Sequence, residues 1–163
     1  MRAGILEAAD LRGQTRTMIG SVIEATVTAT PDPARLRDAL ADLYSTGLGV
    51  AELAVGRGPA AAAQLTALVT ADALAAYERQ ETEFGPAVLR EVERMVRLNV
   101  IDQEWRDHLA DLGILLERAT AGGSAANDPL AAYRHSAAES YDRFLRRVEW
   151  RVVGSLYHLE VAR

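Results

Sequence analysis

Residues 86–121 read PAVLREVERMVRLNVIDQEWRDHLADLGILLERATA, and their apolar side chains lie three or four positions apart along the whole stretch. This spacing places them on one side of an α-helix. The apolar positions are Val88, Val92, Met95, Val96, Ile101, Trp105, Leu109, Leu112, Leu115 and Leu116. Such a helix would measure about 54 Å at a rise of 1.5 Å per residue. We expect its core face to contain Ile101, Trp105, Leu109 and Leu112, with Trp105 as the anchor.

A second apolar series of the same kind fills the end of the chain. Between the two series lies GGSAAN, residues 122–127, a turn-forming stretch, followed by Asp128 as an N-cap and Pro129 in a first helical turn. The second series contains Leu130, Tyr133, Ala137, Tyr141, Phe144, Val148, Val152, Ser155 and Leu159. Two long, nearly equal seams joined by a short loop predict an antiparallel helical hairpin over residues 86–163.

The first 85 residues are divided into shorter segments. Helical spacing predicts one helix over residues 11–29, which the prolines of TPDP, residues 30–33, would end. A short helix is expected over residues 33–44, with Asp32 as its cap and Pro33 in its first position. An alanine-rich helix is expected between GRGP, residues 56–59, and FGP, residues 84–86. With no alternating strand pattern of useful length, the sequence predicts an all-α protein in which a smaller helical region, 1–85, precedes the hairpin.

Composition excludes several classes of chemistry. The chain has 163 residues and no cysteine, which excludes disulfides, cysteine-based zinc sites and thiol nucleophiles. It also has no lysine, so a P-loop lysine and a catalytic lysine are excluded. The net charge of −5 disfavours a nucleic-acid partner. Because no run approaches the roughly 20 apolar residues of a membrane helix, we expect a soluble, cytoplasmic chain with no transmembrane segment.

The polar residues of the long helix allow two interpretations. Glu104 and His108, four residues apart, could chelate a metal ion, but a site needs a third ligand, and only His135 with Glu139 repeats the pair. We therefore predict no metal site and a hydrogen-bonded or surface histidine. The acids are expected to form helical ion pairs on a solvated face, namely Glu93 with Arg97 and Asp102 with Arg106.

The segment YDRFLRRVEWR, residues 141–151, interleaves aromatic side chains with arginines. Such a segment could contact RNA or anionic lipid. The interpretation that we favour is a core stripe with arginines on its outer face, whose aliphatic stems cover apolar surface. The stripe would contain Tyr141, Phe144, Leu145 and Val148.

Two stretches resemble the helical scaffold of the SecA preprotein translocase motor family. ERMVRLNVIDQEWRDHLADL, residues 93–112, resembles the family's ER-x-V-x-L-x-x-ID-x-x-W-x-x-HL pattern, and NDPLAAYRHSAAESYDRFL, residues 127–145, resembles its DPL-x-EY segment. The matching residues of the first stretch are Glu93, Arg94, Val96, Leu98, Ile101, Asp102, Trp105, His108 and Leu109; those of the second are Asp128, Pro129, Leu130, Tyr133 and an aromatic residue at Tyr141. Residues 5–27 and 40–44 are similar to the family's helical wing, so the resemblance spans nearly the whole chain and is weakest over 55–85.

The resemblance implies a function in protein export. In that family the hairpin is a two-helix finger at the mouth of the SecY channel, where it contacts the translocating polypeptide, and ATP is bound by motor domains that would precede Met1. It follows that this chain is no enzyme and binds no cofactor. Its expected partners are SecY, SecA motor domains or a preprotein, and its expected place is the cytoplasm, peripherally at the inner face of the plasma membrane.

The predicted fingertip departs from the family pattern, because small residues replace the usual bulky tip and Ser124 occupies its position. By analogy, the partner contacts would come from Arg118, Gly122, Gly123, Ser124 and Asn127. Two alternatives remain open. One is an orphan helical interaction protein that kept the scaffold and oligomerises, for which exposed apolar surface would be the sign. The other is a helical enzyme that uses Glu104 and His108.

Overall fold

The computed structural model describes residues 10–54, 58–120 and 129–159, and every regular element within them is an α-helix. The helices are α2 (Leu11–Ala29), α3 (Pro33–Leu43), α4 (Val50–Leu53), α5 (Pro59–Phe84), α6 (Pro86–Thr120) and α7 (Pro129–Tyr157). The predicted all-α class is confirmed, and each predicted helix forms; the main difference is that α7 ends at Tyr157, before the end of the chain to which it was predicted to run. The four-residue α4 was not predicted.

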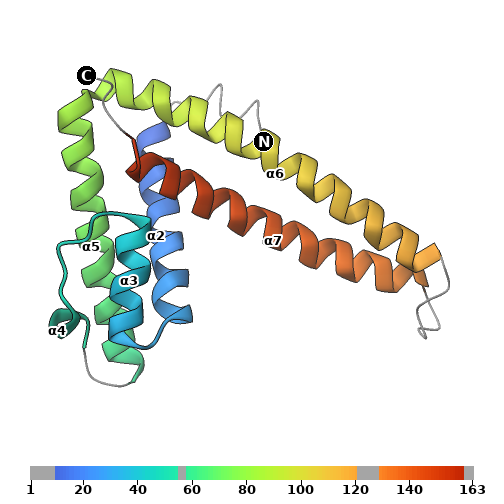
Figure 1. The fold of residues 1–163 in the computed structure, drawn as a ribbon, viewed down its shortest axis with the longest axis horizontal. Coiled ribbons are helices and arrows are strands. Elements are labelled where there is room, and N and C mark those ends of the chain that lie inside the picture. The colour runs from blue at the N-terminus through green and yellow to red at the C-terminus, as the bar shows by residue number, and fades with distance from the viewer. Residues whose placement is uncertain (1–9, 55–57, 121–128, 160–163) are drawn as a thin grey trace.

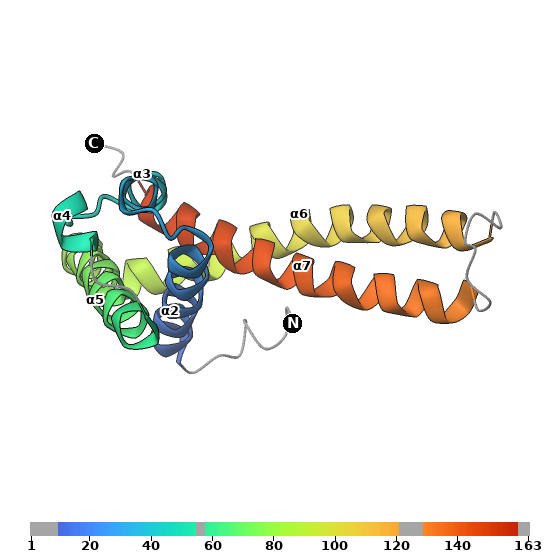
Figure 2. The same cartoon turned by 90° about the horizontal axis from the view of Figure 1, so that it is seen from below.

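The molecule is elongated, with the hairpin of α6 and α7 extending away from a group of shorter helices (Figure 1). The view from below shows α6 and α7 side by side over most of their length (Figure 2). α2, α3, α4 and α5 gather at the base of the hairpin, where α2 packs against α5, α6 and α7. We refer to α2–α5 as the wing. The boundary at residue 85 stays a prediction, although α5 ends and α6 begins on either side of Gly85.

Single residues with capping or turn preferences set the helix ends. The carboxylate of Asp32 accepts a hydrogen bond from the Arg35 backbone N–H at 2.9 Å, and Pro33 takes the first position of α3. Gly85 has a φ of +82°, a region that side-chain-bearing residues rarely adopt, and this turn lets α6 start immediately after α5. The predicted cap at Asp32 and the predicted boundary at Gly85 are therefore confirmed, whereas the cap predicted at Asp128 lies outside the described residues.

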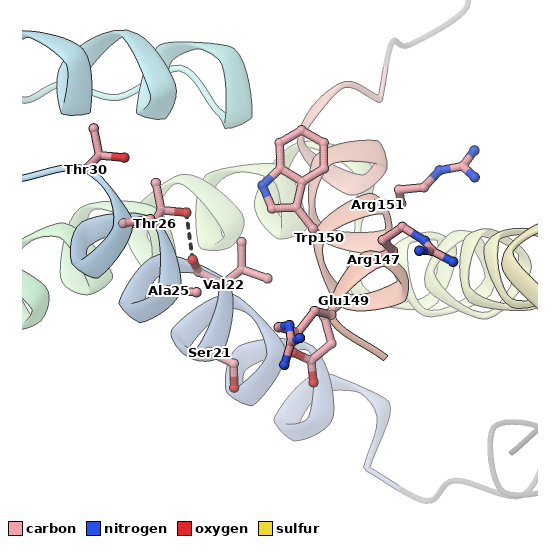
Figure 3. Close-up of a pocket in the computed structure, with 11 residues that line it drawn as sticks. Ser21, Val22, Ala25, Thr26, Thr30, Arg147, Glu149, Trp150 and Arg151 are labelled. Atoms are coloured by element: carbon pink, nitrogen blue, oxygen red, sulfur yellow. Dashed lines mark hydrogen bonds between the residues drawn. The ribbon is translucent and has the colours of Figure 1, made fainter. Parts of the chain in front are cut away.

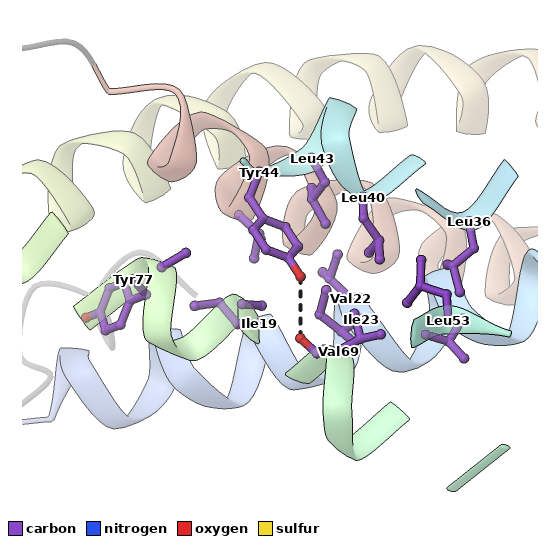
Figure 4. Packing of buried hydrophobic residues seen from close by; sticks show 14 of the residues in the cluster. Ile19, Val22, Ile23, Leu36, Leu40, Leu43, Tyr44, Leu53, Val69 and Tyr77 are labelled. Carbon is purple, nitrogen blue, oxygen red and sulfur yellow. Dashed lines mark hydrogen bonds between the residues drawn. The ribbon is translucent and has the colours of Figure 1, made fainter. Parts of the chain in front are cut away.

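The wing has its own apolar core (Figure 4). α2, α3 and α5 contribute most of it, and Leu53 of α4 closes one end. Tyr44 lies within this core and donates its hydroxyl to the Asp72 carboxylate at 3.0 Å. A second core, at the base of the hairpin, contains Val100, Ile101, Phe144, Val148, Val152 and Leu156. Met18 and Leu159 pack against both cores, so wing and hairpin meet through continuous apolar packing.

By length and composition, α5 is the one helix among the described residues that could cross a membrane. Alanine supplies much of its apolar character. In the structure, Val69, Ala73 and Tyr77 of α5 are buried within the wing core. The absence of a transmembrane segment stays a prediction.

The predicted core face of α6 is wrong in one respect. Ile101 is buried, but Trp105 is 44% exposed and Leu109 is 50% exposed, whereas the neighbouring polar residues Glu104 and His108 are only 3% and 2% exposed. The face toward α7 is thus displaced by about one residue from the expected one. The displacement occurs because α7 offers polar partners that allow Glu104 and His108 to be buried.

Candidate functional site: the helical hairpin and its base

Glu104 of α6 forms the central polar contact between the two hairpin helices. Its carboxylate accepts hydrogen bonds from Arg147 Nε at 2.7 Å and from Arg151 Nη1 at 2.6 Å, both on α7. Arg151 also donates to the side-chain oxygen of Gln103 at 2.8 Å. The Glu104 side chain is 4% exposed, and the two arginines are about two-fifths exposed. One buried carboxylate therefore joins two successive turns of α7 to α6.

The charge state of Glu104 follows from these contacts. Burial alone would raise its pKa, but the hydrogen bonds and charges of Arg151 and Arg147 outweigh burial and hold the pKa below its ordinary value. Glu104 is thus ionised at neutral pH. Water screens the attraction between Glu104 and the arginines less than it screens an exposed pair, but burial of the carboxylate also costs desolvation energy.

His108 lies one turn further along α6 and is buried in a group of aromatic rings. Its ring centroid lies 5.2 Å from that of Phe144, 5.5 Å from Trp105 and 5.9 Å from Tyr141. Its Nδ1 is 3.3 Å from Ser140 Oγ. These contacts favour a packing role with a hydrogen bond for His108 over a role as a metal ligand.

The structure gives the metal hypothesis no supporting geometry. Both carboxylate oxygens of Glu104 are already bonded to arginines. His135 and Glu139 lie 3.3 Å apart, but both side chains are more than half exposed. No group of three His, Cys, Asp or Glu side chains that could hold a metal ion occurs within the described ranges.

A second buried charge cluster joins the hairpin to the wing. Glu93 of α6, which is fully buried, accepts a hydrogen bond from the Tyr77 hydroxyl at 2.6 Å and forms an ion pair with Arg90 at 3.0 Å. Arg90 in turn pairs with Glu81 of α5 at 3.1 Å. Burial is the main cause that raises the pKa of Tyr77, and its bond to the Glu93 carboxylate adds to it. The expected solvated position of Glu93 is therefore wrong.

Arg97 extends this cluster to α2. It donates to the side-chain oxygen of Gln14 at 2.8 Å and to the backbone oxygen of Leu11 at 3.3 Å, and also bonds the hydroxyl of Thr15. Arg97 is 3% exposed, so its predicted place on a solvated face is also wrong. Both errors have one cause: wing helices that are distant in sequence cover this part of α6 and supply the partners.

The remaining residues that match the family pattern lie partly at the surface and partly in the interior. Arg94 is half-buried and pairs with the exposed Glu91, while Tyr133 is half-buried on α7. Of the expected stripe on α7, Phe144 and Val148 are buried, but Tyr141 is 43% exposed. Asp102 is half-buried and Pro129 begins α7. Asp128 lies outside the described residues.

The expected partner contacts are only partly within the described chain. Arg118 is exposed in the last turn of α6. Gly122, Gly123, Ser124 and Asn127 lie outside the described residues. Sequence reasoning missed the roles of Arg147 and Arg151. The signal that could have found them is their spacing of four, which puts two cations on one side of the helix expected to face Glu104.

Comparisons with known proteins agree with this architecture. The family model described as the SecA Wing and Scaffold domain matches residues 1–160. Protein translocase subunit SecA of Nocardioides sp. is 34% identical over 170 residues, which cover 98% of this chain and 18% of that relative. The SecA subunits of Kineococcus radiotolerans and Tropheryma whipplei are 33% and 32% identical, again over 98% of this chain and over 19% and 20% of the relatives. The chain spans about a fifth of the length of these relatives. It belongs to the SecA wing and scaffold family.

Proposed function

We propose that this chain is a SecA-like protein translocation module that acts by contact with a SecA motor partner, the SecY channel or a preprotein. The family match supports a role in translocation. The observation that carries the mode of action is a long apolar face of α6 that is exposed on the outside of the hairpin. Exposed apolar side chains gathered on one face, here interrupted by the half-buried Asp102, are typical of a protein interface.

The exposed face follows a repeat of seven residues. One row contains Val88, Met95, Asp102, Leu109 and Leu116, and a second row, three positions later, contains Leu98, Trp105 and Leu112. We call these eight residues the α6 seam. Val88, Met95, Trp105, Leu109 and Leu116 are each at least 44% exposed. This spacing is that of the a and d positions of a coiled coil, so the surface fits another long helix.

The contacts at the base of the hairpin support a mechanical role. Glu93 and Arg97 connect α6 to α5 and α2, and Glu104 connects α6 to α7. A helix that docks on the α6 seam would therefore be coupled to the wing through buried bonds rather than through a flexible linker. The predicted tip, Arg118 with residues 122–127, would then be the contact for a preprotein or for SecY.

The module would have no ATPase activity and no cofactor of its own. The absence of lysine removes the P-loop lysine from this sequence. The family match concerns the wing and scaffold, and we assign ATP binding to motor domains of a partner. Such a module would work in the cytoplasm, at the inner face of the plasma membrane.

Binding to a motor partner tests this proposal. The partner is a SecA relative from which the wing and scaffold have been deleted, and its affinity for the purified chain is measured. We expect Leu109→Glu, in the α6 seam, to weaken binding at least about tenfold, because a charge would be buried at the contact. Ile114→Glu is the matched control, since Ile114 is similarly exposed on α6 but lies outside the seam. Equal binding by both variants would contradict a contact through the α6 seam, and no binding by the unaltered chain would exclude the motor as the partner.

The α6 seam also supports the alternative that the chain is a helical oligomerisation protein. Two copies could cover their seams with each other, as the helices of coiled-coil dimers do. Sedimentation equilibrium distinguishes the two functions. A dimer that Leu109→Glu dissociates and Ile114→Glu preserves, with no affinity for the motor partner, would favour the oligomerisation protein.

A further inference from the structure

A second apolar surface lies away from the α6 seam, between the C-terminal half of α2 and α7 (Figure 3). It is a groove of about 570 Å³. Its α2 wall contains Ser21, Val22, Ala25, Thr26, Ala29 and Thr30, and its α7 wall contains Arg146, Arg147, Glu149, Trp150 and Arg151. We call it the α2–α7 groove. The contacts proposed above for translocation, the α6 seam and the predicted tip, do not include this groove.

The surface of this groove is mainly apolar, although several of the residues that line it are polar. The Thr26 hydroxyl donates to the Val22 backbone oxygen at 2.8 Å within α2 and is thereby satisfied (Figure 3). Trp150 is 52% exposed and lies beside the apolar side chains of Val22 and Ala25 in the lining of the groove, so its ring adds to one apolar surface. Tryptophan is also the residue type most enriched among the residues that dominate binding energy.

The charged groups that the groove presents to a partner are mainly cationic. Arg146 is exposed and forms no ion pair with any described residue. Arg147 and Arg151 both bond to the buried carboxylate of Glu104, and Arg147 also lies 4.0 Å from the carboxylate of Asp111, yet both arginines stay about two-fifths exposed. Glu149 is half-buried and is the one carboxylate among the residues that line the groove. A chain with a net charge of −5 thus has a locally basic rim here.

The shape of the groove selects a helix. Its lining on α2 extends from Ser21 to Thr30, about 14 Å of helix or between two and three turns. The small residues Ser21, Ala25 and Ala29 lie four apart and allow a second helix to approach closely. An extended peptide would need partners for its backbone N–H and C=O groups, which an apolar groove without a sheet edge cannot provide. A helix satisfies those groups internally.

We propose that the α2–α7 groove binds an amphipathic helix of a partner protein that carries acidic residues beside its apolar face. An apolar side chain of that helix packs on Trp150, and its carboxylates accept hydrogen bonds from the guanidinium of Arg146. The helix is oriented with its carboxylates away from Asp42, which lines the hollow on the other side of Trp150. Charge complementarity of this kind selects the partner more than it raises the affinity.

Two labelled peptides of about 14 residues test this proposal. Both are helical with leucine on one face; the polar face carries glutamate in one and lysine in the other. We expect the glutamate peptide to bind and the lysine peptide not to bind. Trp150→Ala and Arg146→Glu should each weaken binding at least about tenfold. Arg143→Glu, an exposed position on α7 outside the groove, should leave the affinity unchanged. Circular dichroism verifies that each variant is folded.

A spectroscopic measurement locates the peptide. The chain has two tryptophans, so Trp105→Phe leaves Trp150 as the only one. Its emission should shift to shorter wavelength when the glutamate peptide binds. The Leu109→Glu variant should bind the peptide normally, which separates failure of this proposal from failure of the translocation contacts.

Three results would overturn the inference. The first is equal binding of the two peptides, and the second is glutamate-peptide binding that is indifferent to Trp150 and Arg146. The third is Arg146-dependent binding to phosphatidylglycerol vesicles by a chain that ignores the glutamate peptide, which would assign the groove to a lipid surface.

Discussion

Glu104→Gln tests whether the buried carboxylate holds the hairpin helices together. Glutamine keeps the size of the side chain but replaces one acceptor oxygen by an N–H donor, which cannot bond to Arg147 or Arg151. Hydrogen bonds to charged groups contribute about 1.5–3 kcal/mol each. Because both arginines are partly exposed, water compensates for part of the loss. We therefore expect the free energy of unfolding to fall by about 2 kcal/mol at pH 7.

The assay is urea denaturation followed by circular dichroism, with a thermal melt beside it. For a chain of this size, a loss of about 2 kcal/mol lowers Tm by about 4–8 °C. Glu139→Gln is the matched control, since its carboxylate is exposed and pairs only with the exposed His135. That variant should change the free energy of unfolding by less than about 0.5 kcal/mol.

The pH dependence gives a sharper test. The folded-state pKa of Glu104 lies below its ordinary value, which is about 4.3 in an unfolded chain. Its stabilising contribution is therefore complete above about pH 4.3 and is lost as the pH falls through the lower, folded-state pKa. The difference between the wild-type chain and Glu104→Gln should shrink over that acidic range. A difference that stays constant from pH 7 to about pH 3, or no difference at pH 7, would refute the reasoning.

Three further predictions concern the junction and the cores. Tyr77→Phe removes the hydroxyl that donates to buried Glu93, so the free energy of unfolding should fall by about 1–3 kcal/mol, and a fall no larger than that of an exposed control would be inconsistent with the buried bond. Phe144→Ala should cost about 3–5 kcal/mol and Trp105→Ala clearly less in the same denaturation assay, because Phe144 is buried and Trp105 is exposed; the reverse order would restore the core role first expected for Trp105. Gly85→Ala should cost about 1–3 kcal/mol from the positive φ between α5 and α6, and an unchanged melting temperature would contradict this conformation.

Helix positions were largely predictable because prolines and glycines mark them locally. Pro33, Pro59, Pro86 and Pro129 each begin a helix in the structure, and Gly85 separates α5 from α6. These signals depend only on backbone geometry near each residue, so no knowledge of the tertiary structure is needed.

The orientation of α6 was not predictable in the same way. Its apolar residues lie on two faces, one toward α7 and one along the α6 seam. Periodicity alone does not determine which of the two faces packs against α7. Polar residues decided the outcome, since Glu104 is buried only because Arg147 and Arg151 lie opposite it. Those partners are more than forty residues away in the sequence, beyond the reach of local patterns.

The most direct test of the central claim is photo-crosslinking from the α6 seam. A photoreactive amino acid is placed at Leu109, or at Ile114 as the control, and the chain is irradiated with membranes and cytoplasm of its own source. Mass spectrometry then identifies the adducts. We predict adducts with a SecA motor or with SecY from position 109 and not from position 114. Adducts only between copies of this chain, or equal adducts from both positions, would contradict the account of this chain as a translocase module that binds its partner through the α6 seam.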